Sequence, residues 1–381
     1  MEPTDARCLF PLTKQFIFMN HAGVAPMCER AKAAVESVME QLVTRPYPDG
    51  MAQEHAERLR EAVGRLVGAP PDTIGFVRST AHGISLLSQG LDWRPGDNVV
   101  GARGEYPANV YPWMALEERG VEFRMAEPVD GRVSPDLVLS LVDGRTRAVA
   151  LSHVEFWNGY RVDLETIGRE LRSRGVIFAV DAVQSAGAFR LDLDRLPVDF
   201  VSAAAYKWLL GPKGIGFCYC RPELLERLRP LLIGTGTVQR PQEYFEYDYR
   251  LRDSARRFEE SSLSVLDMAA FSAAVGLFLE VGPGRVEEQV LSLSRRLAEG
   301  LAERGYQVLE PWPRRPSEDS GIVSFRRPGS SAREVLRDLT AARVVARTHA
   351  DFVRLSPHFY NTVEEVDRVL DVLAPGGVRV A

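Results

Sequence analysis

Short apolar runs alternate with helical patterns over the first two-thirds of this 381-residue chain. The apolar runs, which are candidate strands, lie at residues 73–77, 98–102, 122–126, 148–153, 177–181, 200–203 and 216–220. The helical patterns between them lie at residues 83–91, 110–119, 134–141 and 164–174. This alternation predicts an α/β fold: a mostly parallel sheet with helices on both faces. In such a sheet, functional side chains gather at the carboxyl ends of the strands.

The last third of the chain has a different pattern. A helical stretch over residues 259–304 is interrupted by Gly282-Pro283-Gly284, which predicts two helices with a break between them. Strand patterns follow at residues 307–309, 321–325 and 352–356, with helical patterns at residues 332–340 and 364–373. We therefore expect a large domain over residues 14–256. A small α+β C-terminal domain over residues 257–381, with residues 1–13, completes the chain.

Charge and cysteine content narrow the class of protein. The net charge is −5 and the pI is about 5.8, so no basic surface for nucleic acid is expected. No apolar run reaches the roughly 18–20 residues that span a bilayer, and the N-terminus is acidic. Neither the four cysteines nor the six histidines have metal-ligand spacing. We expect a cytoplasmic protein without membrane or metal sites, in which Cys218 and Cys220 lie on one strand face in the core.

Two chemically distinctive residues follow apolar runs. Asp181 ends one run, and Lys207 follows the next, just before a glycine-rich turn. Lys207 is one of only four lysines in a chain that otherwise uses arginine as its cation. Lysine forms a Schiff base once its pKa is lowered, whereas arginine cannot. Pyridoxal phosphate bound to a lysine acts as an electron sink, which requires an acidic partner for the pyridine nitrogen. The pair predicts a pyridoxal-phosphate enzyme with Lys207 and Asp181 as its catalytic residues.

Four motifs, two of which contain this pair, make the chain resemble a known family from about Asn20 to about Leu373. It resembles the class V aminotransferase branch of the fold-type I pyridoxal-phosphate enzymes, which includes cysteine desulfurases, kynureninases and isopenicillin-N-epimerase-like proteins. The motifs are Asp181-x-x-Gln184, Tyr206-Lys207 with Gly211-Pro212-x-Gly214, Arg257-Phe258-Glu259, and Arg354-x-Ser356-x-x-x-Tyr360-Asn361-Thr362.

The resemblance implies a set of contacts to the cofactor. Gln184 is expected at the phenolic oxygen of pyridoxal 5′-phosphate, and Tyr106 is expected to stack on its ring. Thr80 and Ala81, at the start of a helix, are expected to hold the phosphate, as helix N-termini do. A plain capping role for this turn is compatible with that function.

The family also implies two further phosphate contacts and two substrate contacts. The hydroxyl of Tyr206 is expected to reach the phosphate. Ser262 stands where the family has a threonine donated to the neighbouring subunit, which implies a homodimer with shared sites. Arg354 is expected to bind the carboxylate of an amino-acid substrate, because its planar fork suits bidentate recognition. His21 is a candidate for a second substrate contact, with a structural histidine as the alternative.

Several reaction types are compatible with these residues. Persulfide-forming desulfurases need a mobile cysteine in the small domain, and residues 257–381 contain no cysteine. We therefore expect an amino-acid aminotransferase. The alternatives are a cysteine-independent C–S lyase that works by β-elimination, an amino-acid epimerase and, last, a non-catalytic scaffold on the same fold. The side chain of the substrate is not readable from the sequence.

Overall fold

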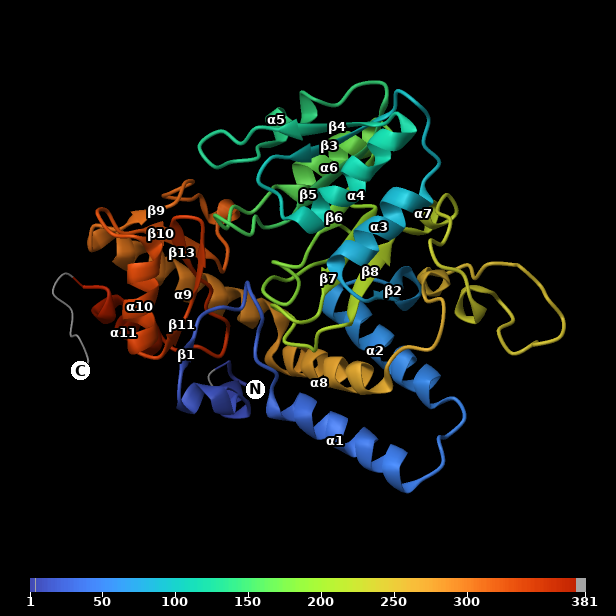
Figure 1. The fold of residues 1–381 in the computed structure, drawn as a ribbon, viewed down its shortest axis with the longest axis horizontal. Coiled ribbons are helices and arrows are strands. Elements are labelled where there is room, and N and C mark those ends of the chain that lie inside the picture. The colour runs from blue at the N-terminus through green and yellow to red at the C-terminus, as the bar shows by residue number, and fades with distance from the viewer. Residues whose placement is uncertain (4, 375–381) are drawn as a thin grey trace.

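A seven-stranded sheet forms the centre of the large domain in the computed structural model, which describes residues 1–3 and 5–374 (Figure 1). The strand order is β2 (Ile74–Val77), β8 (Gly216–Cys220), β7 (Phe200–Ala204), β6 (Ile177–Asp181), β5 (Thr146–Ser152), β3 (Asn98–Ala102) and β4 (Glu122–Ala126). Strands β3 to β7 run parallel, and β8 is antiparallel to its two neighbours. The predicted α/β fold with a mostly parallel sheet is confirmed.

Helices cover both faces of this sheet because the strand side chains alternate between two hydrophobic clusters. Phe178 and Val180 face one cluster, and Ile177 and Ala179 face the other. The first cluster packs on α1 (Glu29–Thr44), α2 (Met51–Val67), α5 (Pro135–Leu139), α6 (Leu164–Ser173) and α8 (Val265–Val281). The second packs on α3 (Thr80–Gly90), α4 (Tyr111–Met114) and α7 (Pro222–Leu225). Cys218 lies in this second cluster with Cys220, as predicted.

The small domain is built on a four-stranded antiparallel sheet in the order β12-β13-β10-β9. Its strands are β9 (Gln307–Val308), β10 (Val323–Arg326), β12 (Arg347–His349) and β13 (Phe352–Leu355). Its helices are α9 (Pro283–Glu303), α10 (Ala332–Ala341) and α11 (Val363–Val372). The predicted break before α9 is present, and α8 and α9 meet there at 84°. Among the described residues no single helix is long and apolar enough to cross a membrane. The bent pair of α8 and α9 reaches the required length and apolar composition only when the two helices are taken together.

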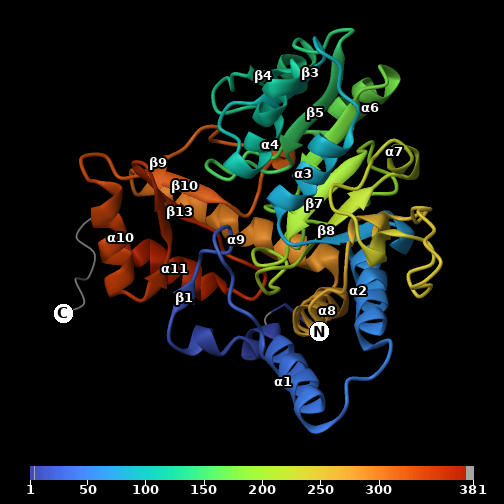
Figure 2. The ribbon, with the colours of Figure 1, turned by 45° about the vertical axis from the view of Figure 1, so that its right-hand side comes forward.

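The N-terminal segment joins the small domain. Strand β1 (Ile17–Phe18) pairs in parallel with β11 (Val344–Val345), and both views place the chain before α1 between the small domain and α8 (Figures 1 and 2). The exact domain division predicted at residues 14 and 257 stays a prediction. Helix α8, which lies beyond residue 257, packs on α1 and α2.

Short 3₁₀ turns connect these elements, at Asp5–Leu9, Pro11–Lys14, Pro71–Thr73, Pro107–Asn109, Ala115–Arg119, Thr235–Thr237, Ala255–Phe258 and Pro316–Glu318. One of them corrects the expected helix at residues 110–119. The chain makes one α-helical turn, α4, and then tightens into the 3₁₀ turn Ala115–Arg119. Gly120 then ends this segment in a left-handed conformation, with φ of 75°.

Candidate functional site

The carboxyl ends of the parallel strands open into a cavity of about 550 Å³, a volume typical of small-molecule sites. Predicted site residues that line it are Tyr106, Gln184, Tyr206, Lys207 and Arg354. Asp181 ends β6 and is buried close enough for its charge to act on Lys207. A second hollow, of about 570 Å³, contains none of the predicted residues. The candidate site is therefore the cavity that holds Lys207.

Burial shifts both members of the central pair toward their neutral forms. Lys207 is 7% exposed, and its pKa falls to about 8 because burial disfavours the ammonium; Asp181 opposes this fall and Arg354 adds to it. Burial raises the pKa of Asp181 to about 6, while the Val183 N–H, 2.8 Å from Oδ1, and the charge of Lys207 pull it down. Lys207 is thus an amine that gives up its proton far more easily than a surface lysine.

Helix α3 begins beside the cavity and leaves backbone donors free. Ser79 caps the helix, accepting the His82 N–H at 3.1 Å. The Thr80 hydroxyl is occupied elsewhere, since it accepts the Ala204 N–H at 3.1 Å. Within the described residues, the N–H groups of Thr80 and Ala81 have no acceptor. Ser79 lines the cavity, whereas Thr80 and Ala81 do not, so they are available to an anion through their backbone only.

A glycine lets this helix start approach the sheet. A Cβ atom on Gly83 would clash with the Ser202 side chain of β7. Arg78 and Lys213 line the cavity beside Ser79 and add positive charge at that end. The start of α3 offers free N–H groups beside the two cations, of which Arg78 also pairs with Glu260, and such an arrangement suits a phosphate.

Aromatic and amide groups form the middle of the cavity. The centroid of the Tyr106 ring lies 5.3 Å from the Lys207 Nζ, and this ring makes an edge contact with Phe156. Gln184 donates from Nε2 to the Ala22 carbonyl at 3.1 Å and accepts the Trp208 indole N–H at 2.8 Å. Its amide is fixed in orientation and keeps one N–H for another partner.

Arg354 lines the cavity and has one buried donor without a partner. Its Nη1 donates to the Phe156 carbonyl at 2.7 Å, but its buried Nε has no hydrogen-bond partner. Burial, with help from Arg347, lowers its pKa to about 10, so it remains a cation at neutral pH. A buried guanidinium with a missing partner is costly, and a carboxylate would supply that partner.

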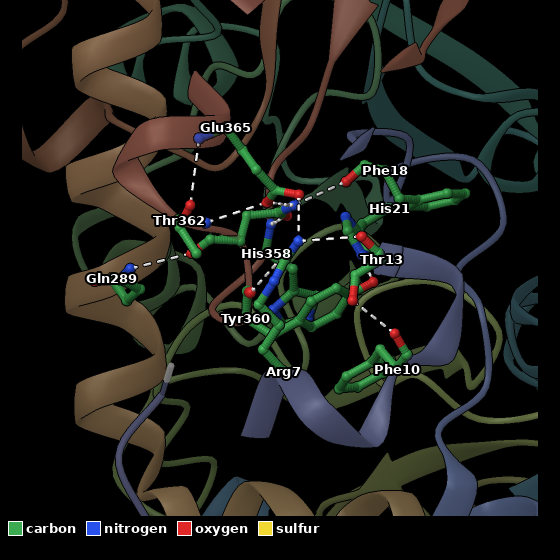
Figure 3. A network of polar contacts seen from close by, with 11 residues as sticks. Arg7, Phe10, Thr13, Phe18, His21, Gln289, His358, Tyr360, Thr362 and Glu365 are labelled. Carbon is green, nitrogen blue, oxygen red and sulfur yellow. Dashed lines mark hydrogen bonds and ion pairs between the residues drawn. The ribbon is translucent and has the colours of Figure 1, made fainter. Parts of the chain in front are cut away.

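His21 does not contact the cavity, contrary to the expectation that it could touch substrate. It is fully buried; its Nδ1 lies 2.8 Å from the Ser356 carbonyl, and its Nε2 lies 2.6 Å from the Tyr360 hydroxyl. Figure 3 shows this ring inside a polar network that joins the N-terminal segment to the chain around Tyr360. Both ring nitrogens are used, so the structural alternative describes His21. Its neighbours Asn20 and Ala22 line the cavity instead.

Ser262 lies outside the cavity of its own chain. It is exposed and lines a separate hollow of about 260 Å³, together with Arg60 and Glu259. A single chain therefore does not bring Ser262 to Lys207, and its expected role in a neighbouring subunit stays a prediction.

The sequence interpretation missed several lining residues: Arg78, Phe156, Lys213, Arg347 and His349. It also missed Glu105, a buried carboxylate that accepts the backbone N–H and the hydroxyl of Ser152. Burial raises the pKa of Glu105 to about 7. For Arg347 and His349 the sequence did offer a signal: they are two residues apart and shortly precede Arg354, so they could share a strand face near it.

The residues present fit pyridoxal 5′-phosphate. Its aldehyde requires an amine with a lowered pKa, its ring nitrogen a buried carboxylate, and its phosphate a set of N–H donors; Lys207, Asp181 and the start of α3 offer these in one place. The fold and this cavity together define a pyridoxal-phosphate enzyme of fold type I.

The chain belongs to the aminotransferase class-V family, whose model matches residues 27–369. It is similar to a probable cysteine desulfurase of Methanothermobacter thermautotrophicus, with 28% identity over 98% of each chain. It is also similar to the isopenicillin N epimerase of Streptomyces clavuligerus, with 27% identity over 97% of each chain. The apo structure of a cysteine desulfurase from Thermococcus onnurineus shares its fold, with a TM-score of 0.88, 26% identity, and coverage of 98% of this chain and 97% of that one.

Proposed function

We propose that this enzyme is an aminotransferase that acts at Cα of an α-amino acid. The observation that carries the proposal is the pairing, across one cavity, of the buried amine of Lys207 with the unpartnered guanidinium N–H of Arg354. Bound pyridoxal phosphate supplies an electron sink for the charge left when the Cα proton departs. The cytoplasmic location expected from the sequence remains part of this proposal.

The protein's own groups have distinct tasks in this proposal. Arg354 binds the substrate carboxylate and so orients the Cα–H bond. Lys207, once freed by the incoming amino group, takes the Cα proton at Nζ and returns it to a second carbon on the same face. Asp181 would hold a proton at the ring nitrogen of bound pyridoxal phosphate, and the Tyr106 ring would lie against the cofactor ring. A single proton carrier is sufficient for transamination.

Two other reactions stay as candidates because relatives carry those names. A thiol-free C–S lyase would need only Lys207 for proton transfer and a substrate with a sulfur leaving group. An epimerase would need a second proton carrier, and His349 is a titratable ring on the cavity wall. The test is to incubate the purified enzyme with an amino-acid panel and an acceptor 2-oxo acid. Acceptor-dependent formation of a new 2-oxo acid supports the proposal; sulfide with ammonia, or inversion at Cα, replaces it.

We expect turnover without any protein thiol. Cys218 and Cys220 are buried in the core, where burial raises the pKa of Cys218 to about 12 and that of Cys220 well above its usual value. No cysteine lines the cavity within the described residues. A variant with Cys8, Cys28, Cys218 and Cys220 all changed to alanine or serine should keep its cofactor absorbance and most of its kcat. A folded variant that loses turnover, with persulfide trapped on a parent cysteine, would instead indicate a desulfurase.

We also propose a homodimer in which each copy lends Ser262 to the other. A projecting segment, yellow in Figure 1, exposes Tyr244, Phe245, Tyr247 and Tyr249 by 63–94%. Apolar surface of this extent marks an interaction site, and this segment contributes to the same hollow as Ser262 through Tyr244.

Sedimentation should therefore show a dimer at assay concentration. Ser262→Ala should weaken phosphate binding by about 1.5–3 kcal/mol, which is the range for a hydrogen bond to a charged group. Cofactor titration measures this loss. Ser261→Ala, a change at the adjacent exposed hydroxyl, serves as the matched control. A fully active monomer, or equal effects of the two variants, would refute the shared site.

A further inference from the structure

Strand β12 presents two side chains to the cavity that the proposed chemistry does not use. Arg347 and His349 are two residues apart on one strand, so they lie on the same face, and both line the cavity. A short turn then leads to β13, which carries Arg354. The wall beside the substrate carboxylate therefore holds two arginines and a histidine.

The two arginines stand directly opposite one another. Arg347 and Arg354 are register partners on the antiparallel strands β12 and β13. Like charges in this position repel and destabilise a sheet unless an anion lies between or beside them. The repulsion also contributes to the lowered pKa of Arg354. Among the described residues, Arg347 makes no hydrogen bond and no ion pair through its side chain that would offset this cost.

In the described part of the chain, the charged side chains that line the cavity are all cations, while the Asp181 carboxylate is buried beside Lys207. The cavity lining includes five cationic side chains, Arg78, Lys207, Lys213, Arg347 and Arg354, and no aspartate or glutamate. The cofactor phosphate accounts for the cations beside α3, and the α-carboxylate of the substrate accounts for Arg354. Arg347 is left without an anion.

His349 adds a hydrogen-bonding group next to this free cation. Its Nε2 is buried without a partner, and its ring makes an edge contact with Phe156 at 5.8 Å between centroids. Burial, followed by the charges of Arg354, Arg347 and Lys207, lowers its pKa to about 4, so the ring is neutral at physiological pH. A neutral imidazole has one N–H to donate to an acceptor oxygen.

We propose that the substrate is a dicarboxylic amino acid, whose side-chain carboxylate is bound by Arg347 and His349 while Arg354 holds its α-carboxylate. This inference rests on the proposed action at Cα of an amino acid. The guanidinium of Arg347 offers a planar fork that matches a carboxylate. Binding of this second carboxylate would neutralise the facing pair of arginines. The competing arrangement, in which both arginines grip the same α-carboxylate, makes a different prediction.

The experiment measures binding, so it does not depend on the reaction type. The cofactor-loaded enzyme is titrated with glutarate and with pentanoate, which have the same chain length but two carboxylates and one. Calorimetry and the cofactor absorbance follow each titration. Glutarate should bind about tenfold tighter or more, because a hydrogen bond to a charged group typically contributes at least that much to affinity.

Arg347→Gln separates the two arrangements. It should abolish the preference for glutarate, leave pentanoate affinity unchanged and leave the cofactor absorbance intact. Arg326→Gln, which breaks a surface pair with Asp351 on the neighbouring part of the sheet, is the matched control and should keep the preference. Equal binding of the two acids to the parent enzyme would overturn the inference. So would an equal loss for both acids in Arg347→Gln, because that result places both arginines on one carboxylate.

The amino-acid panel tests the underlying reaction separately. If dicarboxylates bind preferentially but the products are those of a lyase or an epimerase, the aminotransferase proposal falls and the substrate class stands. If transamination proceeds equally well with glutamate and glutamine, the substrate class falls and the aminotransferase proposal stands.

Discussion

Replacing Lys207 with alanine should reduce kcat by about 10³-fold or more while pyridoxal phosphate still binds. The variant removes the buried amine whose pKa falls to about 8, and a positioned proton carrier typically contributes about 10²–10⁴-fold. Turnover of the best panel substrate measures the loss. Borohydride reduction followed by peptide mapping should find the cofactor on Lys207 in the parent enzyme and on no residue in Lys207→Ala.

Lys213 provides the control for this prediction because it also lines the cavity as a lysine. Lys213→Ala should retain the borohydride label on Lys207. If the label in the parent enzyme were mapped to Lys213, the assignment of Lys207 would be wrong.

Replacing Arg354 with alanine should lower kcat/KM for α-amino acids. The corresponding loss of transition-state stabilisation should be about 2–5 kcal/mol, the usual cost of removing one partner of a desolvated charge pair. The side chain is 3% exposed and its Nε has no partner in the protein, so a substrate carboxylate is its natural acceptor. The cofactor absorbance should be unchanged, which separates lost substrate binding from a damaged fold.

Steady-state kinetics of Arg354→Ala, Arg354→Lys and the surface variant Arg326→Ala measure this effect. Lysine should restore only part of the activity, because a point charge lacks the fork geometry. Unchanged kcat/KM in Arg354→Ala would mean that the guanidinium is structural, held by the Phe156 carbonyl alone.

Strands β3, β6 and β8 were predictable because each is a short apolar run buried on both faces, whereas the edge strand β4 is only partly buried. Strands β3, β4, β6 and β8 begin and end at the predicted residues. Parallel strands placed between helices leave little choice of fold class. The helix expected at residues 110–119 was not predictable in detail, since the tightening after Met114 depends on how the chain packs under Val121 and Gly120, a tertiary property.

Site residues could be proposed from the sequence where the chemistry requires a particular residue type. They could not be proposed where their role depends on the orientation of the side chain in the folded protein. Lys207, Asp181 and Arg354 could be proposed from the sequence because no other side chain replaces an amine, a buried carboxylate or a carboxylate fork, and their roles stay predictions. For His21 the sequence left a substrate contact and a structural role open, because its position beside Asn20 does not reveal which way the ring points. Arg347 was overlooked because its significance lies in its register opposite Arg354, which only strand pairing reveals.

The direct test of the central claim is a single-turnover experiment. The cofactor-loaded enzyme is mixed with its best amino-acid substrate in the absence of any acceptor 2-oxo acid. We expect one equivalent of 2-oxo acid per active site, after which product formation stops until an acceptor is added. Continued release of 2-oxo acid and ammonia without an acceptor, or inversion at Cα with no 2-oxo acid formed, would contradict the aminotransferase proposal.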